Sequence, residues 1–523
     1  MQQVLGVFDI LGPVMIGPSS SHTAGASRIG FMSRQILDAE PTKISLFLYG
    51  TMGKNYRECN NHTALVGGLL GWKADDLRLS DAISIAQKGG TQVDWTVLDD
   101  PIDHPNTVRI MAISKEGLKV EVTGVSLGAG KIHIKDINGH IVNMADDKQG
   151  LLLIVDSKGQ KKALGLLSEQ GVDIQKAQES TNVDEHLLLA DTNQPVAQDL
   201  IKDLRSIPGV RLASRLLPID RRVVKDVGPI ESIQAIVETA ELKKGSLAEM
   251  FLQREMSRLG LSREELIADM REIVVVMRNS TERGLKGHLP SIQNLMGNDA
   301  RKMDVSRRKR GAFFGDTLAK VVARAMGVVE VCGSLTAPVV AAPTGGASGT
   351  VPGVVITIGE ELKISDDVIA MALFSAGGVG IIMAQKIGLS GSVGGCQAEC
   401  GAASAIAAAA AAQMVGGSPS QVVNAAAIAL KNHLGQVCDT IVGVRGGIPC
   451  VKRNATSAAV ALVGAEMALA GIESAVPFDE VAEALATIGV GLPDDFKGRR
   501  TSGLADTLTG RTIQKRFNEE TQV

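Results

Sequence analysis

The part of the chain that follows residue 225 carries apolar residues at the three- and four-residue spacing of amphipathic helices. The clearest periodic stretches each begin at a serine, a residue that commonly caps a helix N-terminus. This pattern predicts helices over 232–243, 246–258 and 262–277. Beyond residue 318 the helical segments become rich in Ala and Gly, as in 402–414, which favours helices buried against one another. We therefore expect an all-helical domain over 225–523.

The first 147 residues mix strand-like and helical patterns. Runs of β-branched and apolar residues predict strands at 44–49 and 119–123, and a helix of small residues is expected from about residue 24. The mixture predicts an α+β domain over 1–147.

The segment 148–224 has a pattern of its own, in the order strand, helix, strand, strand, helix, strand. The expected elements are strands at 151–155, from 172, at 186–190 and from 210, with helices at 161–170 and 196–206. This βαββαβ order is the split-βαβ arrangement. The fold class that we predict is therefore multidomain: an α+β domain, a βαββαβ domain and an all-helical domain.

Composition excludes several classes of partner. The chain has 523 residues and a net charge of -3, which gives no sign of a nucleic-acid surface. Six cysteines in so long a chain are too few for a disulfide framework and favour a reducing compartment. The N-terminus lacks the pattern of a signal peptide. We expect a cytoplasmic protein.

Two apolar stretches raise the alternative of a membrane protein. Residues 331–358 carry no charge, and a second apolar run covers 375–385. Prolines and glycines interrupt the first run, and the second is too short to span a bilayer. We interpret both as buried segments and expect no membrane partner.

Cys396, Cys438 and Cys450 each lie in a short segment with glycine, proline or small residues. Three thiolates brought together by a fold can hold an iron-sulfur cluster and leave one iron without a protein ligand. Inert core cysteines are the alternative, because no closely spaced pair typical of zinc or ferredoxin sites is present. Cys332 and Cys400 are expected to be core residues, with Cys400 as a reserve ligand.

Serines and histidines mark further candidate chemistry. The run GPSSSHT at 17–23 precedes the small-residue helix, and hydroxyls with free N–H groups at a helix start suit a carboxylate; an ordinary serine cap is the alternative. His104 precedes a proline, a position that is most often a simple turn. An unperturbed histidine titrates near neutrality, so it can also move a substrate proton.

Several segments together resemble the bacterial iron-sulfur-dependent L-serine dehydratases (L-serine ammonia-lyases), in the form that fuses beta-type, ACT and alpha-type parts. These segments are GPSSSHTAGASRIG, APTGGASGTVPG, GGCQAE, LKNHLGQVCD and IPCVKRNA, in that order, and the resemblance covers nearly the whole chain. It implies a lyase of amino-acid catabolism, supplying gluconeogenesis, that converts L-serine to pyruvate and ammonia. It also implies a [4Fe-4S] cluster on Cys396, Cys438 and Cys450, an ACT-like regulatory domain over 148–224 and a homodimer.

The same resemblance implies roles for other residues. The implied catalytic residues are Ser20, Ser21, His22 and His104, with His62 as a further candidate. The implied substrate-binding residues are Ser19, Thr344, Ser348, Arg453 and Asn454.

Two departures from the family pattern keep other functions open. After the strand at 44–49 the family carries Gly-His-Gly-Thr-Asp, whereas Cys59 here stands in place of that histidine and His62 in place of that aspartate. Arg445 lies in a loop that is one residue longer than usual. The alternatives are a lyase acting on another hydroxy acid or on a thiol amino acid, and a non-catalytic amino-acid sensor.

Overall fold

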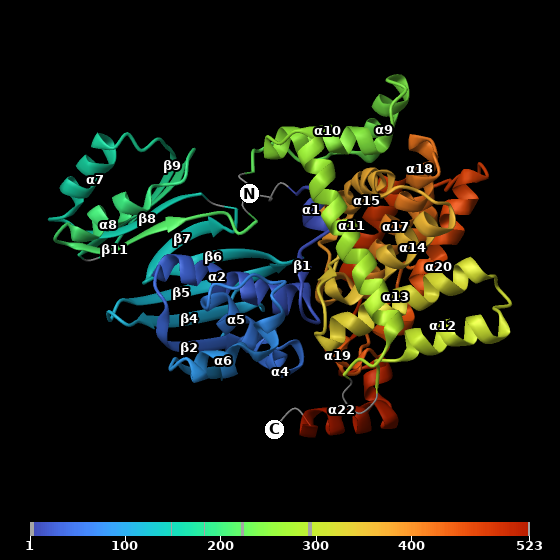
Figure 1. The fold of residues 1–523 in the computed structure, drawn as a ribbon, viewed down its shortest axis with the longest axis horizontal. Helices are drawn as coiled ribbons and strands as arrows, with labels where there is room; N and C mark the ends of the chain where they lie inside the picture. Colours follow the sequence, from blue (N-terminus) through green and yellow to red (C-terminus); the bar gives the residue numbers. More distant parts are fainter. Residues whose placement is uncertain (1–4, 148, 183, 221–223, 291–294, 521–523) are drawn as a thin grey trace. The chain divides into compact units, whose positions relative to one another are not determined.

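The computed structural model describes residues 5–147, 149–182, 184–220, 224–290 and 295–520 (Figure 1). Side chains at 444 and 446 are not described. The chain forms two compact units. One comprises residues 21–224 and the other comprises residues up to 20 together with residues from 225 onward. We call them the sheet unit and the helical unit.

The larger sheet of the sheet unit has six strands in the order β3-β2-β4-β5-β6-β7. These are β2 (Pro41–Tyr49), β3 (Gln92–Leu98), β4 (Thr107–Ser114), β5 (Lys119–Gly128), β6 (Lys131–Ile137) and β7 (His140–Ala145). β2 runs parallel to β3, and the other neighbours are antiparallel. The strands predicted at 44–49 and 119–123 are confirmed as parts of β2 and β5.

Helices α2 (Gly25–Leu37) and α5 (Asn61–Leu69) pack against each other beside this sheet (Figure 1). Small residues permit their close approach: a Cβ added to Gly30 would lie 2.1 Å from the Leu65 carbonyl oxygen. α2 follows a π-helical turn, η1 (Ser20–Ala24), and its N-cap makes no side-chain hydrogen bond. A serine that simply caps this helix, which was the alternative for the GPSSSHT run, is therefore not what the structure shows.

The second sheet of the sheet unit has four antiparallel strands in the order β11-β8-β10-β9. Its elements are β8 (Gly150–Asp156), α7 (Gln160–Glu169), β9 (Ile174–Thr181), β10 (Glu185–Thr192), α8 (Gln198–Ser206) and β11 (Val210–Leu216). The first and third strands lie in the middle of the sheet. The predicted βαββαβ order is confirmed.

The helical unit begins with the three helices whose caps the sequence indicated. These are α9 (Ile233–Leu242), α10 (Leu247–Leu259) and α11 (Arg263–Lys286). Ser232, Ser246 and Ser262 each accept a hydrogen bond from the backbone N–H three residues ahead. The prediction of these helices is confirmed, although α11 continues beyond the predicted end at 277.

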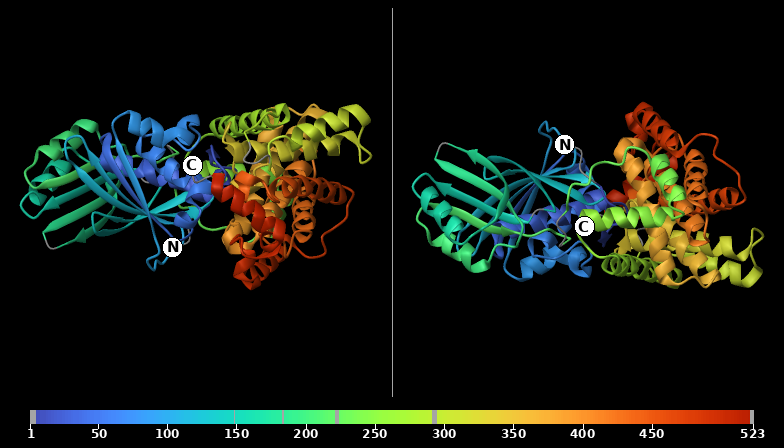
Figure 2. Two further views of the ribbon diagram at one scale, coloured as in Figure 1. Left: turned by 90° about the horizontal axis from the view of Figure 1, so that it is seen from below. Right: turned by 90° about the horizontal axis from the view of Figure 1, so that it is seen from above.

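The remaining helices form a bundle that both views of Figure 2 show. Its longer members are α12 (Asp299–Arg310), α13 (Asp316–Ser334), α14 (Thr350–Glu361), α15 (Asp366–Ile387), α17 (Cys400–Met414), α18 (Pro419–Lys431), α20 (Cys450–Leu469), α21 (Phe478–Gly491) and α22 (Leu508–Glu520). Within the described residues one helix, α15, is long and apolar enough to cross a membrane, and 78% of its apolar window is buried inside the structure. That burial is typical of a core helix.

The first residues of the chain belong to the helical unit and form an arm. Arg258 and Glu255 on α10 anchor α1 (Val7–Ile10): Arg258 donates to Asp9 at 2.6 Å, and Glu255 accepts from the Val7 N–H at 3.0 Å. Further along, β1 (Val14–Met15) pairs with β12 (Val339–Val340). This two-stranded ladder is an exception to the all-helical pattern, and it supplies backbone partners for an extended segment.

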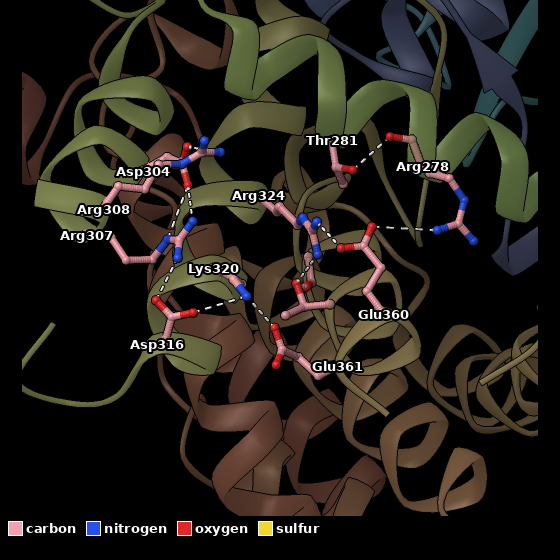
Figure 3. A network of polar contacts seen from close by, with 12 residues as sticks. Arg278, Thr281, Asp304, Arg307, Arg308, Asp316, Lys320, Arg324, Glu360 and Glu361 are labelled. Atoms are coloured by element: carbon pink, nitrogen blue, oxygen red, sulfur yellow. Dashed lines mark hydrogen bonds and ion pairs between the residues drawn. The ribbon is translucent and has the colours of Figure 1, made fainter. Parts of the chain in front are cut away.

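Charged side chains link several helices of this unit, as Figure 3 shows. Arg307 on α12 contacts Asp316 on α13 at 2.6 Å, and Lys320 on α13 contacts both Asp316 and Glu361. Arg324 pairs with Glu360 on α14. Because most of these groups are partly exposed, the network contributes modestly to stability.

Candidate active site

The three predicted cysteine ligands lie on three separate segments of the helical unit. Cys396 begins a 3-10 turn, η5 (Cys396–Ala398), directly after Gly395, whose φ of 75° favours glycine. Cys438 is held by two backbone hydrogen bonds, to the Phe496 carbonyl and from the Gly498 N–H. Cys450 is the first residue of α20. Cys438 packs with Cys396, and the Cys450 thiol is near enough to Cys396 to interact with it electrostatically, so the three thiols lie in one region. We call it the thiol centre.

Burial and mutual repulsion perturb these thiols. Burial, followed by the neighbouring Cys396 and Glu399, raises the pKa of Cys450 to about 12. Burial and Glu399 likewise raise the pKa of Cys438 well above its ordinary value. The pKa of Cys396 is lowered, first because the Cys400 thiol hydrogen-bonds to it and also because Arg453 is near. Cys396 is therefore the thiol of the centre that ionises most readily.

Cys400, which was expected to be a core residue, lies in contact with the thiol centre. It packs with Cys396 and Cys438, is 2% exposed, and hydrogen-bonds to the Cys396 sulfur, which raises its own pKa well above normal. Among the described residues, however, no three His, Cys, Asp or Glu side chains are close enough to bind one metal ion. Four thiols therefore lie in one region, but they do not form a site that would bind a single metal ion.

Arg453 is the positive charge of the thiol centre. It donates to the Val437 carbonyl at 2.9 Å and to Asp439 Oδ1 at 2.6 Å. Although burial alone would lower it, the negative charges of Cys396 and Asp439 raise the pKa of Arg453 above its ordinary range. Arg453 therefore stays protonated, and one of its contacts is already taken by Asp439.

The predicted substrate loop packs beside these cysteines. Thr344 caps the 3-10 turn η4 (Gly345–Ala347) by accepting from the Ala347 N–H, and its hydroxyl donates to Glu399 Oε1 at 2.9 Å. Ser348 is fully buried and lies beside Cys332. The structure thus brings Thr344 to the thiol centre and places Ser348 in the supporting interior.

Asn454 holds this loop to the helix that carries Cys450. Its Oδ1 accepts from the Gly349 N–H at 3.0 Å, and its Nδ2 donates to the Gly346 carbonyl at 2.8 Å and to the Cys450 carbonyl at 3.0 Å. The side chain is fully buried. Its amide is therefore a clamp between the loop and α20.

The arm brings two of the predicted serines to the same loop. A Cβ added to Gly345 would lie 3.2 Å from both the Pro18 carbonyl oxygen and the Ser20 N–H nitrogen. The Cys332 thiol donates to the Gly17 carbonyl at 3.0 Å and contacts the Gly345 carbonyl at 3.4 Å. Segment 17–20, which includes Ser19, is thereby fixed against the loop that carries Thr344.

The predicted histidines of the sheet unit are linked through two residues that the sequence did not single out. His22 Nε2 lies 3.2 Å from Thr51 Oγ1, and Thr51 hydrogen-bonds to Asn106 Oδ1. The Asn106 N–H in turn donates to His104 Nδ1 at 3.1 Å. Ser21 contributes its carbonyl, which accepts from Ser126. We call His22 and His104, linked in this way through Thr51 and Asn106, the histidine pair. The HPN motif at 104–106 was the available signal for Asn106.

The environment of His104 disfavours its protonated form. Burial and the positive charge of Lys135 lower the pKa of His104, and Asp103 offsets this only in part. His62 lies at the start of α5, and its ring is 5.0 Å from the rings of Tyr56 and Trp95. The backbone carbonyl of Cys59 accepts from Thr23, next to His22.

Two family models match this chain. Residues 242–505 match the serine dehydratase alpha chain, and residues 6–136 match the serine dehydratase beta chain. The chain is 36% identical over 286 residues to the probable L-serine dehydratase alpha chain of Bacillus subtilis, which covers 55% of this chain and 94% of that relative. It is 42% identical over 152 residues to the probable beta chain of the same organism, covering 29% and 69%. The L-serine dehydratase of Streptomyces coelicolor is 27% identical over 518 residues, covering 96% and 98%.

A helical unit with a buried thiol centre, joined in one chain to a sheet unit with paired histidines, defines a lyase that fuses alpha-type and beta-type modules. The chain belongs to the serine dehydratase family. The resemblance stated from its motifs is thereby confirmed.

Proposed function

We propose that this chain converts L-serine to pyruvate and ammonia with a [4Fe-4S] cluster held by Cys396, Cys438 and Cys450. The convergence of these three thiols, from distant parts of the sequence, is the observation that carries the proposal. The names of the relatives support the substrate, because the Streptomyces coelicolor protein matches along 96% of this chain. The closest competing function is the same elimination on another hydroxy acid or on a thiol amino acid.

The chemistry of the donor set fits such a cluster. Buried thiols that raise one another's pKa cannot all ionise unless positive charge is added, and Arg453 is already paired with Asp439. Iron supplies that charge, and thiolates are its usual ligands in clusters. Each ligand of a cluster binds a different iron, so three such sulfurs need not be as close as the ligands of one ion. This accounts for a thiol centre without a single-ion site among the described residues.

Dehydration requires loss of the α-proton and departure of hydroxide. When bound, the cluster supplies a Lewis-acid iron that makes hydroxide a better leaving group. Arg453 and the hydroxyl of Thr344 orient the substrate, and Ser19 and Ser20 of the arm provide hydroxyl and N–H donors for its carboxylate. Ser348 and Asn454 support the loop from behind.

The hydrogen bonds of the histidine pair support proton-transfer roles for its two histidines. The Thr51 hydroxyl has only acceptors at Pro105 and Asn106, so it donates to one of them and accepts from His22 Nε2. We therefore propose His22 as the residue that takes the α-proton. His104 Nδ1 accepts from the backbone, so its proton is on Nε2, which acts as a donor. His62 remains a candidate that supports this group through its aromatic neighbours.

Iron and acid-labile sulfide in anaerobically purified protein, measured alongside pyruvate and ammonia, test the proposal. Cys438→Ser is expected to lose iron and product formation while its circular dichroism is unchanged. Cys332→Ser is the matched control, since a serine hydroxyl can still donate to the Gly17 carbonyl, and it should keep its iron. Wild-type protein that contains no iron and releases no ammonia from L-serine would refute the proposal. A panel with threonine, cysteine and hydroxydicarboxylic acids identifies a different substrate.

Other properties complete this proposal. We propose that 148–224 is an ACT-like regulatory domain between a beta-type domain at 1–147 and a catalytic domain at 225–523. Its βαββαβ topology supports this. We also propose a cytoplasmic homodimer, which light scattering after gel filtration tests directly.

A further inference from the structure

Glu399 is a carboxylate at the thiol centre that the proposed reaction has not used. It lies between Cys396 and Cys400 in the sequence and is partly exposed. One oxygen accepts from Thr344 Oγ1 at 2.9 Å, and the Gly391 N–H also hydrogen-bonds to this carboxylate. A Cβ added to Gly391 would lie 2.4 Å from Glu399 Oε2 and 3.2 Å from Cys438 Sγ. The carboxylate therefore lies beside both the predicted substrate loop and a predicted ligand.

The charge of Glu399 is not neutralised in the way that other interior carboxylates are. Within the part of the chain that the structure describes, no ion pair involves Glu399. Other buried carboxylates meet a cation or a helix N-terminus: Asp146 with Arg28, Glu255 with Arg258, Asp304 with Arg307, Asp439 with Arg453, and Glu330 with the N–H groups of Gly297, Asp299 and Ala300.

A carboxylate accepts about four hydrogen bonds, and Thr344 with Gly391 provide two. The remaining capacity suits a small cationic group with several N–H donors. L-serine carries one such group, its α-ammonium. Arg453 cannot bind it because a guanidinium only donates, and the serine hydroxyls of the arm can accept from it but carry no negative charge.

We propose that Glu399 binds the α-ammonium group of the substrate and makes the site select amino acids over hydroxy acids. This inference rests on the proposed function, since it concerns the same centre. It explains why a carboxylate is kept beside thiols that it repels: the substrate supplies the missing positive charge. Thr344, which donates to Glu399, positions the carboxylate for this contact.

Two unreactive ligands that differ only by the ammonium group test the inference. L-alanine and propanoate both lack the hydroxyl that leaves, so calorimetry can measure their dissociation constants on reconstituted protein. Glu399→Gln keeps the shape of the side chain and an oxygen for Thr344 while it removes the charge. We expect it to weaken L-alanine about 10- to 100-fold, the usual effect of losing a charged hydrogen-bonded pair. Propanoate affinity and iron content should be unchanged, and the KM for L-serine should rise.

Asp439→Asn is the matched control, because it removes a carboxylate of the same centre that is already paired with Arg453. It should alter L-alanine and propanoate binding by the same factor. Equal weakening of both ligands by Glu399→Gln, or loss of iron from that variant, would assign Glu399 to the scaffold and overturn the inference. Wild-type protein that binds propanoate as tightly as L-alanine would overturn it too. Failure of the proposed function looks different, since wild type would then lack iron or pyruvate formation whatever its ligand preference.

Discussion

Replacing Asn454 by leucine tests whether this side chain holds the Thr344 loop to α20 or binds the substrate. The amide accepts from the Gly349 N–H and donates to the Gly346 carbonyl, and the side chain is fully buried. Leucine has a similar size but no polar atom, so one backbone N–H and one carbonyl lose the partner that Asn454 provides. The Cys450 carbonyl is within the first turn of α20 and keeps its helical partner.

Each buried polar group that loses its partner costs about 1–3 kcal/mol, so the substitution should lower the free energy of unfolding by roughly 2–6 kcal/mol. At about 2 °C per kcal/mol for a large domain, the melting temperature should fall by roughly 4–12 °C. The loop that carries Thr344 would also separate from the helix that carries Cys450. We therefore expect less iron per chain at temperatures well below the melting transition.

Differential scanning calorimetry and iron determination on anaerobically reconstituted protein measure both effects. Ser375→Ala is a suitable control, because it removes a buried hydrogen bond to Gln413 on α17 away from the cysteines. It should lower the melting temperature slightly and leave the iron content unchanged. If Asn454→Leu instead kept its melting temperature and iron while the KM for L-serine rose, Asn454 would be a substrate ligand and the clamp reasoning would be wrong.

Three further outcomes follow from charges elsewhere in the molecule. Lys135→Met removes a positive charge that lowers the pKa of His104, so the pKa of His104 should rise. Protonation of His104, which breaks the hydrogen bond from the Asn106 N–H, then occurs at higher pH, and the acid limb of the kcat/KM profile should move to higher pH. Arg258→Met leaves Glu255 buried without its cation and should cost about 3–5 kcal/mol, measured by urea unfolding followed by circular dichroism. Glu360→Gln in the network of Figure 3 should lower the free energy of unfolding by less than about 1 kcal/mol. In about 0.5 M salt the Debye length is on the order of a few Å, so screening should make this loss smaller still.

Local signals predicted the serine-capped helices because caps and apolar periodicity depend on neighbouring residues. The serines before α9, α10 and α11 cap those helices as expected. The end of α11 was predicted too early because its apolar periodicity stops near residue 277. Beyond that point a small residue makes the contact: a Cβ added to Gly284 would lie 2.4 Å from the backbone of Gly327 on α13. Close backbone packing leaves no hydrophobic pattern in a sequence.

The sequence offered candidate site residues one by one, but it did not show how they are connected. Cys396 and Cys400 are four residues apart, on the 3-10 turn η5 and at the start of α17, and this short separation is a local signal for their contact. The link from His22 to His104 runs through Thr51 and Asn106, which lie in different segments; the HPN motif marks Asn106, but no pattern marks Thr51 or joins the two. Contacts of that kind depend on tertiary structure.

The thiol centre has an electrostatic order that bears on the proposed binding of iron. Cys396 has the lowered pKa, so it is the first thiol available as a thiolate, whereas Cys438 and Cys450 remain protonated at neutral pH. Metal binding must displace their protons, which makes cluster assembly more favourable as pH rises. Glu399 opposes ionisation of Cys438 and Cys450, and Arg453 favours it. Under the proposed function, these two charged side chains would set the balance between a protonated centre and one that holds iron, and the proposed cationic substrate group at Glu399 would shift that balance toward the metal-bound form.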